Sequence, residues 1–214
     1  KISDKDYDQI KEEILKLEKK YNFLNSDKSP SKTVGYTPSK IFKKVLHRAP
    51  MLSLSNAFSE SDLENFEKKI LNFLSKGTNT RLLYSAEPKI DGISASLTYI
   101  NGIFQKGLSR GDGKEGEDIT ANLETINDIP KKIDFKDFPE DIDIRGEVFI
   151  QNSDFVNLKD KFANPRNAAS GSLRQKNPDD TKKIPLKFIA YTFGFEKGLT
   201  VENQSEYLKK LSKW

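Results

Sequence analysis

The chain has 214 residues, and its 36 Lys and Arg against 32 Asp and Glu give a formal net charge of +4 at pH 7. The lack of Cys and the single His exclude disulfides, thiolate metal sites and a histidine cluster for zinc. No apolar run approaches the roughly 18 residues of a membrane span, and the first residues do not resemble a signal peptide, so we expect a cytoplasmic protein without a membrane segment.

The first predicted element is a helix over residues 4–21. Its apolar residues recur every three or four positions between Lys and Glu, which is typical of an amphipathic helix. Residues 22–50 are rich in Ser, Pro, Lys and Gly without a sustained period, and they indicate a connector. We therefore predict two domains, a helical module with its connector over residues 1–45 and a larger domain over residues 46–214.

A second helix is predicted after this connector. Ser61 and Glu64 have the spacing of a capping box, in which each side chain accepts a hydrogen bond from the backbone N–H of the other residue. Apolar residues follow at helical spacing, namely Leu63, Phe66, Ile70 and Leu74. We expect Gly77 to end the helix, because glycine readily adopts the left-handed conformation common after helix ends.

From residue 93 the apolar period changes to two, which is typical of strands. Residues 93–100 alternate between apolar and polar side chains, and Asn101-Gly102 has the composition of a two-residue type I′ turn. We therefore predict a hairpin whose second strand covers residues 103–109. A glycine-rich acidic loop follows over residues 111–118.

Residues 141–150 predict a further strand with one apolar and one polar face. The apolar face carries Ile142, Ile144, Val148 and Ile150, and the other face carries Asp143, Arg145, Glu147 and Phe149. The remaining predicted elements are a short helix over 153–162, a helix that begins at Asn164-Pro165, a strand over 186–195 and a helix over 201–214. Hairpins and helices in mixed order, without regular βαβ units, indicate the α+β class with mixed, mainly antiparallel sheets and flanking helices.

The segment Ser85–Gly92 carries the clearest chemical signal. It is expected to leave a strand, expose Lys89 between the carboxylates of Glu87 and Asp91, and enter another strand through its glycine. Lysine is a nucleophile only when deprotonated, so its pKa of about 10.4 must be lowered by burial or by neighbouring cations. Taken alone, the same eight residues also fit a surface turn with an ion pair.

Five segments, in this order along the chain, resemble the NAD-dependent DNA ligases. Glu87–Gly92 is similar to the first motif of the covalent nucleotidyltransferases, whose lysine forms a lysine–AMP or lysine–GMP intermediate. The other four segments are Pro50–Phe58, Ser109–Gly113, Ile144–Phe149 and Phe162–Gln175. The resemblance extends to the N-terminal helix, where three residues match the module that receives the nicotinamide mononucleotide half of NAD, namely Asp4, Tyr7 and Asp8.

The resemblance implies a role for each matching residue. Lys89 would take AMP from NAD and release nicotinamide mononucleotide, and Asp91 would orient the amine or serve proton transfer. Arg166 and Arg174 are eight residues apart, on roughly one face of the helix that starts at Asn164-Pro165, and would bind a phosphate of nicked DNA or of the adenylate. The other residues implied to bind the cofactor are Asp4, Tyr7, Asp8, Ser53, Leu54, Glu87, Arg110, Glu147 and Tyr191.

Several of these implied roles are specific to one chemical group. Glu87 would accept a hydrogen bond from the adenine amino group, and Arg110 would bind ribose or phosphate oxygens. Of Glu147 and Arg145, which share a strand face, one would bind ribose or a metal ion while the other pairs with it. Tyr191 would stack on adenine, although an aromatic residue in an aromatic-rich strand is more often part of the core.

The implied reaction begins with self-adenylation of Lys89 by NAD. AMP then passes to a 5′-phosphate at a nick in double-stranded DNA, and the 3′-hydroxyl seals the nick, with Mg²⁺ neutralising the phosphates. The implied protein is a monomer. In this family two further lysine-bearing strands follow the matched part, so we expect this chain by itself to self-adenylate weakly or not at all.

Two other functions remain open from the sequence. One is a non-catalytic module that binds nucleotide or DNA through a basic surface. The other is an ATP-dependent nucleotidyltransferase, which shares the lysine motif but lacks the N-terminal helical module. His47 is a lone histidine and is expected to be structural.

Overall fold

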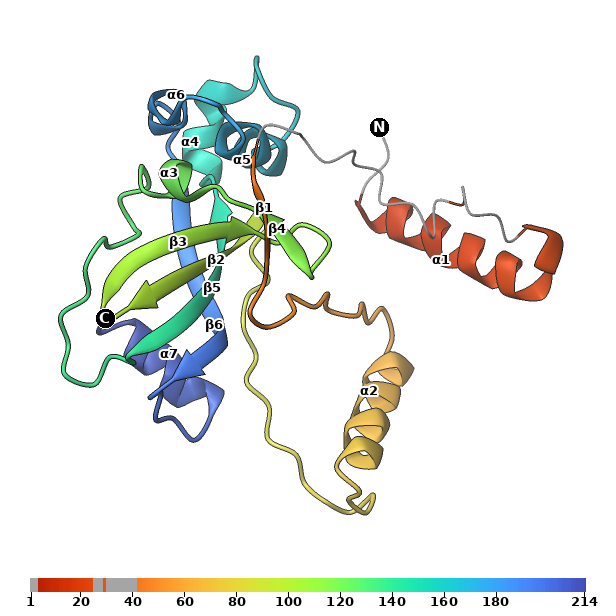
Figure 1. Ribbon diagram of the computed structural model, residues 1–214. Helices are drawn as coiled ribbons and strands as arrows, with labels where there is room; N and C mark the ends of the chain where they lie inside the picture. Colours follow the sequence, from red (N-terminus) through yellow and green to blue (C-terminus); the bar gives the residue numbers. More distant parts are fainter. Residues whose placement is uncertain (1–3, 25–28, 30–41) are drawn as a thin grey trace. The chain divides into compact units, whose positions relative to one another are not determined.

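The computed structural model consists of two units (Figure 1). The first unit is Lys1–Ile41 and the second is Phe42–Trp214. Within these units the structure describes residues 4–24, 29 and 42–214. None of the helices in this described part is long and apolar enough to cross a lipid bilayer.

The first unit contains helix α1 (Asp4–Lys20), followed by the 3₁₀ helix η1 (Asn22–Leu24). This confirms the helix predicted over residues 4–21. Three side chains of α1 that have a predicted role lie outside the described residues, namely those of Asp4, Tyr7 and Asp8. Their role therefore stays a prediction.

The second unit is built on a four-stranded antiparallel sheet in the order β3-β2-β5-β6 (Figure 1). Its strands are β2 (Ile93–Ile100), β3 (Ile103–Ser109), β5 (Asp141–Phe149) and β6 (Lys187–Lys197). Asn101 and Gly102 join β2 to β3 with φ angles of 50° and 74°, as a type I′ turn requires. The predicted hairpin and the two predicted strands after it are therefore confirmed.

A separate two-stranded sheet pairs β1 (Lys44–Leu46) with β4 (Glu115–Glu117) in antiparallel register. The sequence predicts neither strand, since β1 lies in the expected connector and β4 in the glycine-rich loop. Strands of three residues are too short to show a period, and each forms because the other satisfies its backbone groups. The residues from Phe42 onward are therefore structured as part of the second unit.

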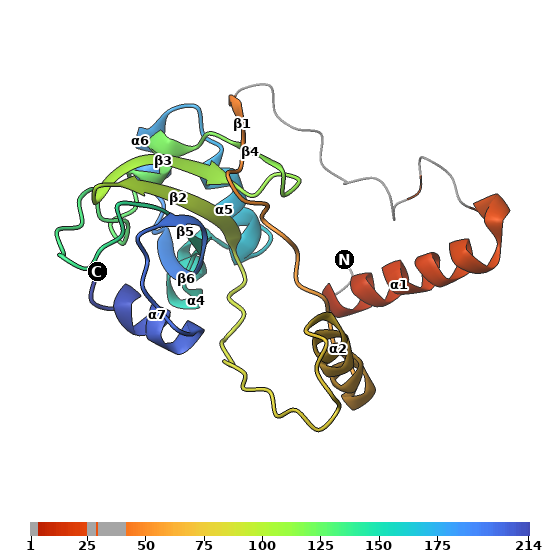
Figure 2. The same ribbon diagram turned by 60° about the horizontal axis from the view of Figure 1, so that its bottom comes forward.

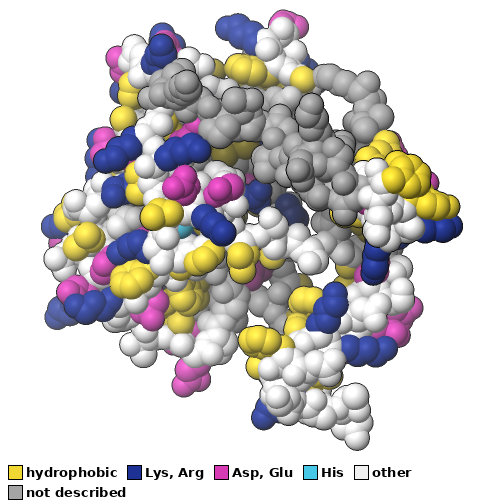
Figure 3. Space-filling model, turned by 45° about the vertical axis from the view of Figure 1, so that its right-hand side comes forward, with side chains coloured by type: hydrophobic (Ala, Val, Ile, Leu, Met, Phe, Trp, Pro, Cys, Tyr) yellow, Lys and Arg dark blue, Asp and Glu magenta, His cyan; other side chains and the backbone are white. Residues whose placement is uncertain are grey.

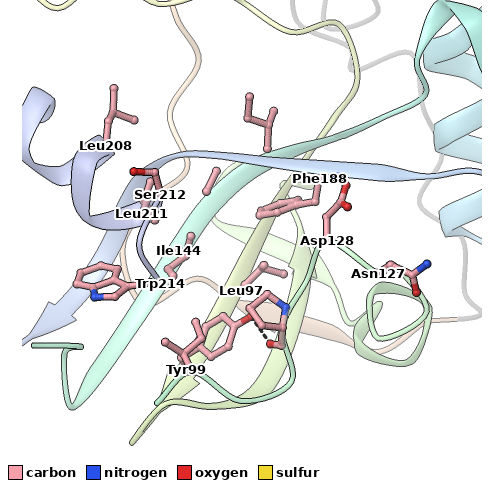
Figure 4. A pocket seen from close by; sticks show the side chains of 14 residues that line it. Leu97, Tyr99, Asn127, Asp128, Ile144, Phe188, Leu208, Leu211, Ser212 and Trp214 are labelled. Carbon is pink, nitrogen blue, oxygen red and sulfur yellow. Dashed lines mark hydrogen bonds between the residues drawn. The ribbon is translucent and has the colours of Figure 1, made fainter. Parts of the chain in front are cut away.

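One face of the four-stranded sheet forms the core of the second unit. The buried side chains of this face include Ala95, Leu97, Tyr99, Ile142, Ile144 and Val148. Helix α7 (Gln204–Leu211) packs beside β6 (Figure 2), where the ring of Tyr207 lies 5.0 Å from that of Phe193. A mainly apolar cavity of about 550 Å³ opens on the same face, and Leu208, Leu211 and Trp214 line it from the C-terminal end of the chain (Figure 4).

Short helices complete the second unit around the sheet. They are α3 (Thr120–Leu123), α4 (Asn152–Phe155), the 3₁₀ helix η2 (Val156–Leu158), α5 (Pro165–Leu173) and α6 (Pro178–Lys182). Helix α5 begins as predicted, because the Asn164 side chain accepts a hydrogen bond from the backbone N–H of Asn167 and Pro165 occupies the first turn. The helix predicted over 153–162 is confirmed only in part, since η2 ends at Leu158.

Helix α2 (Glu60–Phe73) has its N-cap two residues before the predicted N-cap, Ser61. The N-cap is Ser59, whose side chain accepts a hydrogen bond from the backbone N–H of Asp62, while the Asp62 carboxylate accepts one from the backbone N–H of Ser59. The predicted box of Ser61 and Glu64 is therefore wrong. The earlier start is favoured because the Asp62 carboxylate also accepts a hydrogen bond from the backbone N–H of Phe58.

The end of α2 also differs from the prediction. The helix ends before Gly77, and Ser75 takes the left-handed conformation instead, with a φ of 51°. Residues 74–92 form neither helix nor strand between α2 and β2 (Figures 1 and 2), so the strand expected before Lys89 is absent. Apolar side chains are exposed among Lys and Arg on the side of the molecule that Figure 3 shows, and Leu63 and Phe66 of α2 are among the exposed apolar residues.

Gly92 lies where the Lys89 segment enters β2, and we expect Gly92→Ala to destabilise the fold. An added Cβ would lie 2.3 Å from the carbonyl oxygen of Val148 and 2.9 Å from the side chain of Glu147. Because the first of these atoms belongs to the backbone of β5, relief requires the strand itself to move. Overpacking of this kind predicts a loss of about 2 kcal/mol in the free energy of unfolding, measured by urea denaturation.

Gly77→Ala is the matched control for this substitution. Nothing lies within 4 Å of a Cβ added at Gly77, so its free energy of unfolding is expected to stay within about 0.5 kcal/mol of the original. Equal stability of the two alanine variants would contradict the predicted clash.

Candidate active site

Lys89 lines a cavity of about 520 Å³ in the second unit. The cavity is lined by Lys89, Ile90, Asp91, Phe149, Ile150, Gln151, Asn152, Ser153 and Pro165. Three parts of the chain therefore meet here: the irregular segment before β2, the end of β5 with the turn into α4, and the start of α5. Lys89 is exposed and lies in an irregular segment, as a surface turn would have it. The ion pair of that alternative is not formed, because Asp91 pairs with Arg166 and Glu87 accepts a hydrogen bond from Gln204.

Asp91 is paired with an arginine of α5. The Nη1 of Arg166 donates a hydrogen bond to Oδ1 of Asp91 at 3.0 Å, and the two side chains are 50% and 60% exposed. This contact ties the first turn of α5 to the segment that carries Lys89. The arginine predicted to bind phosphate and the carboxylate predicted to serve the amine are therefore neighbours in the structure.

Glu147 is the buried carboxylate of the site, with 8% of its surface exposed. Its Oε2 accepts a hydrogen bond from the hydroxyl of Ser94 at 2.9 Å, across the pair β2–β5. Burial raises the pKa of Glu147, while the Ser94 hydrogen bond and the charges of Arg166, Lys89 and Arg110 oppose this rise. Three predicted cations thus favour the charged form of this one carboxylate.

The raised pKa of Glu147 makes the stability of the protein depend on pH. Between the ordinary glutamate pKa of about 4.3 and the raised value, the folded state binds more protons than the unfolded state. The free energy of unfolding should therefore fall as pH rises through this window. We expect Glu147→Gln to remove this contribution, so the stability difference between the original protein and the variant shrinks or reverses as pH rises from about 4 to 7 in urea titrations. A difference that does not change with pH would contradict the assignment.

Arg145 does not pair with Glu147, and this expectation is wrong. Its Nη1 donates to the carbonyl oxygen of Pro50 at 3.0 Å, and its Nη2 donates to that of Ala49. The reason lies in the fold: the segment before Met51 crosses the sheet beside β5 and offers two carbonyl oxygens to the guanidinium. The sequence pattern shows which strand face Arg145 occupies but not which backbone approaches that face.

Glu87 and Tyr191 are joined by Gln204, a residue that no sequence motif marks. The side-chain amide of Gln204, the first residue of α7, donates to Oε1 of Glu87 at 3.0 Å and to the carbonyl oxygen of Tyr191 at 2.7 Å. Burial raises the pKa of Tyr191, and Glu147, Arg145 and Arg110 act on it electrostatically. Tyr191 therefore faces the polar side of the sheet and not the apolar core. No motif marks Gln204, because its two partners are distant in the sequence.

Arg174 is held by a different acid from the partner of Arg166. Its Nε donates to Oε2 of Glu117 at 3.1 Å, and Glu117 is buried, with 4% of its surface exposed. Arg174 follows the last residue of α5, whereas Arg166 lies in the first turn of the same helix. The two arginines are thus anchored at opposite ends of α5.

Ser53 and Leu54 lie in the irregular segment between Met51 and α2. Both residues are exposed, and Leu54 has 78% of its surface exposed. Met51 is buried, so the chain leaves the folded surface immediately before these two residues. Their predicted contact with adenosine stays a prediction.

The carboxylates of the site decide how the predicted Mg²⁺ could be held. Among the residues that the structure describes, no three His, Cys, Asp or Glu side chains gather in a way that could hold a metal ion by themselves. Mg²⁺ is commonly held by one or two carboxylates together with water and substrate phosphates. The single buried carboxylate of Glu147 is compatible with this second mode only.

The family model and the curated relatives that match this chain all describe DNA ligases. The model of a family described as the NAD-dependent DNA ligase adenylation domain matches residues 39–214. The chain is 64% identical over 214 residues to a protein of Pelagibacter ubique (strain HTCC1062) named DNA ligase, which covers all of this chain and 32% of that protein. It is 46% identical over 217 residues to a DNA ligase of Bradyrhizobium sp. (strain ORS 278), covering 98% of this chain and 30% of that protein. The chain spans about a third of the length of the curated relatives it matches.

Proposed function

The chain belongs to the NAD-dependent DNA ligase adenylation domain family, and from this membership we propose that, when joined to the remaining parts of such a ligase, it performs the first chemical step of DNA ligation with NAD as the AMP donor. In this proposal Lys89 is the nucleophile and the cavity beside it receives the phosphate of the AMP half. The observation that supports it most directly is the ion pair of Arg166 with Asp91, which joins the start of α5 to the Lys89 segment beside the cavity.

The proposed step exchanges one bond to phosphorus for another. The neutral Lys89 amine attacks the phosphorus of the AMP half, a nitrogen–phosphorus bond forms, and the phosphorus–oxygen bond to nicotinamide mononucleotide breaks. The amine proton leaves to solvent or to the carboxylate of Asp91, which Arg166 holds in place. The products are a lysine–AMP adduct and free nicotinamide mononucleotide.

The neighbouring side chains supply binding and charge stabilisation. Arg110 and Arg166 would bind the phosphate or ribose oxygens, since a guanidinium donates several hydrogen bonds in a fixed plane. Glu87, held by Gln204, would accept a hydrogen bond from adenine. Glu147 would contact ribose or hold Mg²⁺, which, when bound, would neutralise charge on the phosphates.

The later steps of the proposed function involve nicked DNA and the nicotinamide mononucleotide half of NAD. AMP would pass from Lys89 to the 5′-phosphate at a nick, and Arg174 would contact a phosphate of the DNA or of the adenylate. The helical module predicted over residues 1–45 would receive the nicotinamide mononucleotide half through Asp4, Tyr7 and Asp8.

The test is a chimera in which this chain replaces the 214 matching residues of the Pelagibacter ubique DNA ligase. The chimera is incubated with NAD and Mg²⁺, with ATP as the control nucleotide, and is examined by intact mass and peptide mapping. We expect an AMP adduct on Lys89 with NAD only, together with sealing of nicked duplex DNA. An adduct with ATP only would favour the ATP-dependent alternative. No adduct, when the parent ligase forms one, would favour a non-catalytic binding module.

A further inference from the structure

A short segment, residues 47–51, is held across the polar face of the sheet, and we call it the strap. Arg48 anchors it: its guanidinium donates to both carboxylate oxygens of Asp143 and to both of Asp141 on β5. The Asp143 side chain is 6% exposed and also accepts a hydrogen bond from the hydroxyl of Thr98 at 2.7 Å. One arginine thus joins two carboxylates on one strand, a geometry that lysine cannot reproduce.

Arg145 holds the strap from the opposite direction. It extends from β5 and donates to the carbonyl oxygens of Ala49 and Pro50, so it binds the backbone of the strap rather than a side chain. The guanidinium packs directly against Gly194 of β6, where an added Cβ would lie 2.6 Å from Nη2 of Arg145. The absence of a side chain at Gly194 makes room for this arginine.

The strap in turn holds the loop that follows β3. The backbone N–H of His47 donates to the carbonyl oxygen of Lys114, and that of Met51 donates to the carbonyl oxygen of Gly113, each at 2.8 Å. The Nε2–H of His47 donates to the carbonyl oxygen of Arg110 at 3.1 Å. The strap therefore holds the carbonyl oxygen of Arg110. The backbone N–H of Arg110 is held separately, because it donates a hydrogen bond to the carbonyl oxygen of Ser94.

We propose that Arg48 and Arg145 are positioning residues for the adenylation step: through the strap they fix the backbone of Arg110 and the point from which Ser53 and Leu54 extend. This inference rests on the proposed function, because it concerns residues expected to bind the nucleotide. Neither arginine needs to touch the substrate. Their effect is on how firmly the nucleotide-binding residues are held before NAD arrives.

Amide hydrogen exchange of the 214-residue chain tests the structural half of the inference without any nucleotide. In Arg48→Ala, exchange in peptides that cover residues 43–52 and 110–117 should become about tenfold faster, because local opening then costs less. Exchange in β2 and β5 should stay as it was. Unchanged exchange in the strap would overturn the inference.

Self-adenylation of the chimera tests the functional half. Arg48→Ala should raise the KM for NAD about tenfold and change kcat by less than about twofold, since the lost interaction serves binding and Lys89 itself is not attached to the strap. Arg48→Lys should recover only part of the loss. A KM equal to that of the parent chimera, with the strap opened, would overturn the positioning role.

Two further variants keep the test decisive. Asp141→Asn weakens the ion pair with Arg48, and the Asp141 side chain is 22% exposed. It should therefore raise the KM for NAD as well, and it provides a test even if Arg48→Ala does not fold. Lys197→Ala removes an exposed ion pair with Glu140 at the same end of the sheet and should leave the KM unchanged. If the chimera takes no AMP from NAD before any substitution, the proposed function fails first, and this inference with it.

Discussion

Replacing Lys89 by arginine in the chimera is expected to abolish the covalent AMP adduct and to reduce nick sealing by about a thousandfold or more, as removal of a nucleophile does in other enzymes. Arginine keeps the positive charge beside Glu147, so binding of the nucleotide phosphates should change little. It cannot lose a proton at neutral pH, so it cannot form the nitrogen–phosphorus bond. The substitution therefore separates the charge of Lys89 from its chemistry.

The measurement is intact mass after incubation with NAD and Mg²⁺, with nick sealing followed on a labelled duplex. Lys106→Arg, in which an exposed lysine of β3 is replaced in the same way, should retain both activities. If Lys89→Arg still seals nicks at the parent rate, the protein uses another nucleophile or only binds its substrates, and the proposed mechanism is wrong.

The second large effect is expected from Arg174→Ala. This substitution removes the Nε hydrogen bond to Glu117, whose Oε1 is buried and has no hydrogen-bond partner among the described residues. A buried carboxylate that loses its cation is strongly destabilising, but the Arg174 side chain is 32% exposed, so water replaces part of the interaction. We expect a loss of about 2 kcal/mol in the free energy of unfolding, measured by urea denaturation.

Glu117→Gln in the Arg174→Ala background tests this cause. The neutral amide removes the buried charge, so the double variant should be more stable than Arg174→Ala alone. In the chimera, Arg174→Ala should still form the Lys89 adduct but seal nicks about tenfold more slowly, because a phosphate contact is lost. If the double variant is less stable than Arg174→Ala, the unpaired buried charge of Glu117 is not the cause of the lost stability.

Local patterns were sufficient for most of the strands and long helices. The alternation over residues 93–100 and 141–150 and the Asn101-Gly102 turn predict elements that the structure confirms, because each pattern spans several residues and expresses one period. The start of α2 was predicted wrongly because two overlapping capping boxes are present and hydrogen bonds to Asp62 decide between them. The strands β1 and β4 lack any such pattern.

The residues of the candidate site also fall into two groups, those that a sequence motif marks and those that no motif marks. Three separate segments point to Asp91, Glu147 and Arg166, and the structure joins Asp91 and Arg166 by an ion pair beside the cavity that Lys89 lines. No local motif marks Gln204 or Arg48, because each acts through hydrogen bonds to residues far away in sequence. When the role of a side chain depends on a partner far away in sequence, no local sequence pattern identifies that side chain.

The sequence by itself determined the α+β class, the hairpin and the family, since these depend on periods and motifs within short stretches of chain. Only the tertiary structure decided which charges are paired. It assigned Arg145 to the backbone of the strap instead of to Glu147, Arg48 to two carboxylates of β5, and Arg174 to the buried Glu117. The physical reason is that an ion pair or a backbone hydrogen bond forms between groups that the fold brings within about 3 Å, and sequence separation carries no information about that distance.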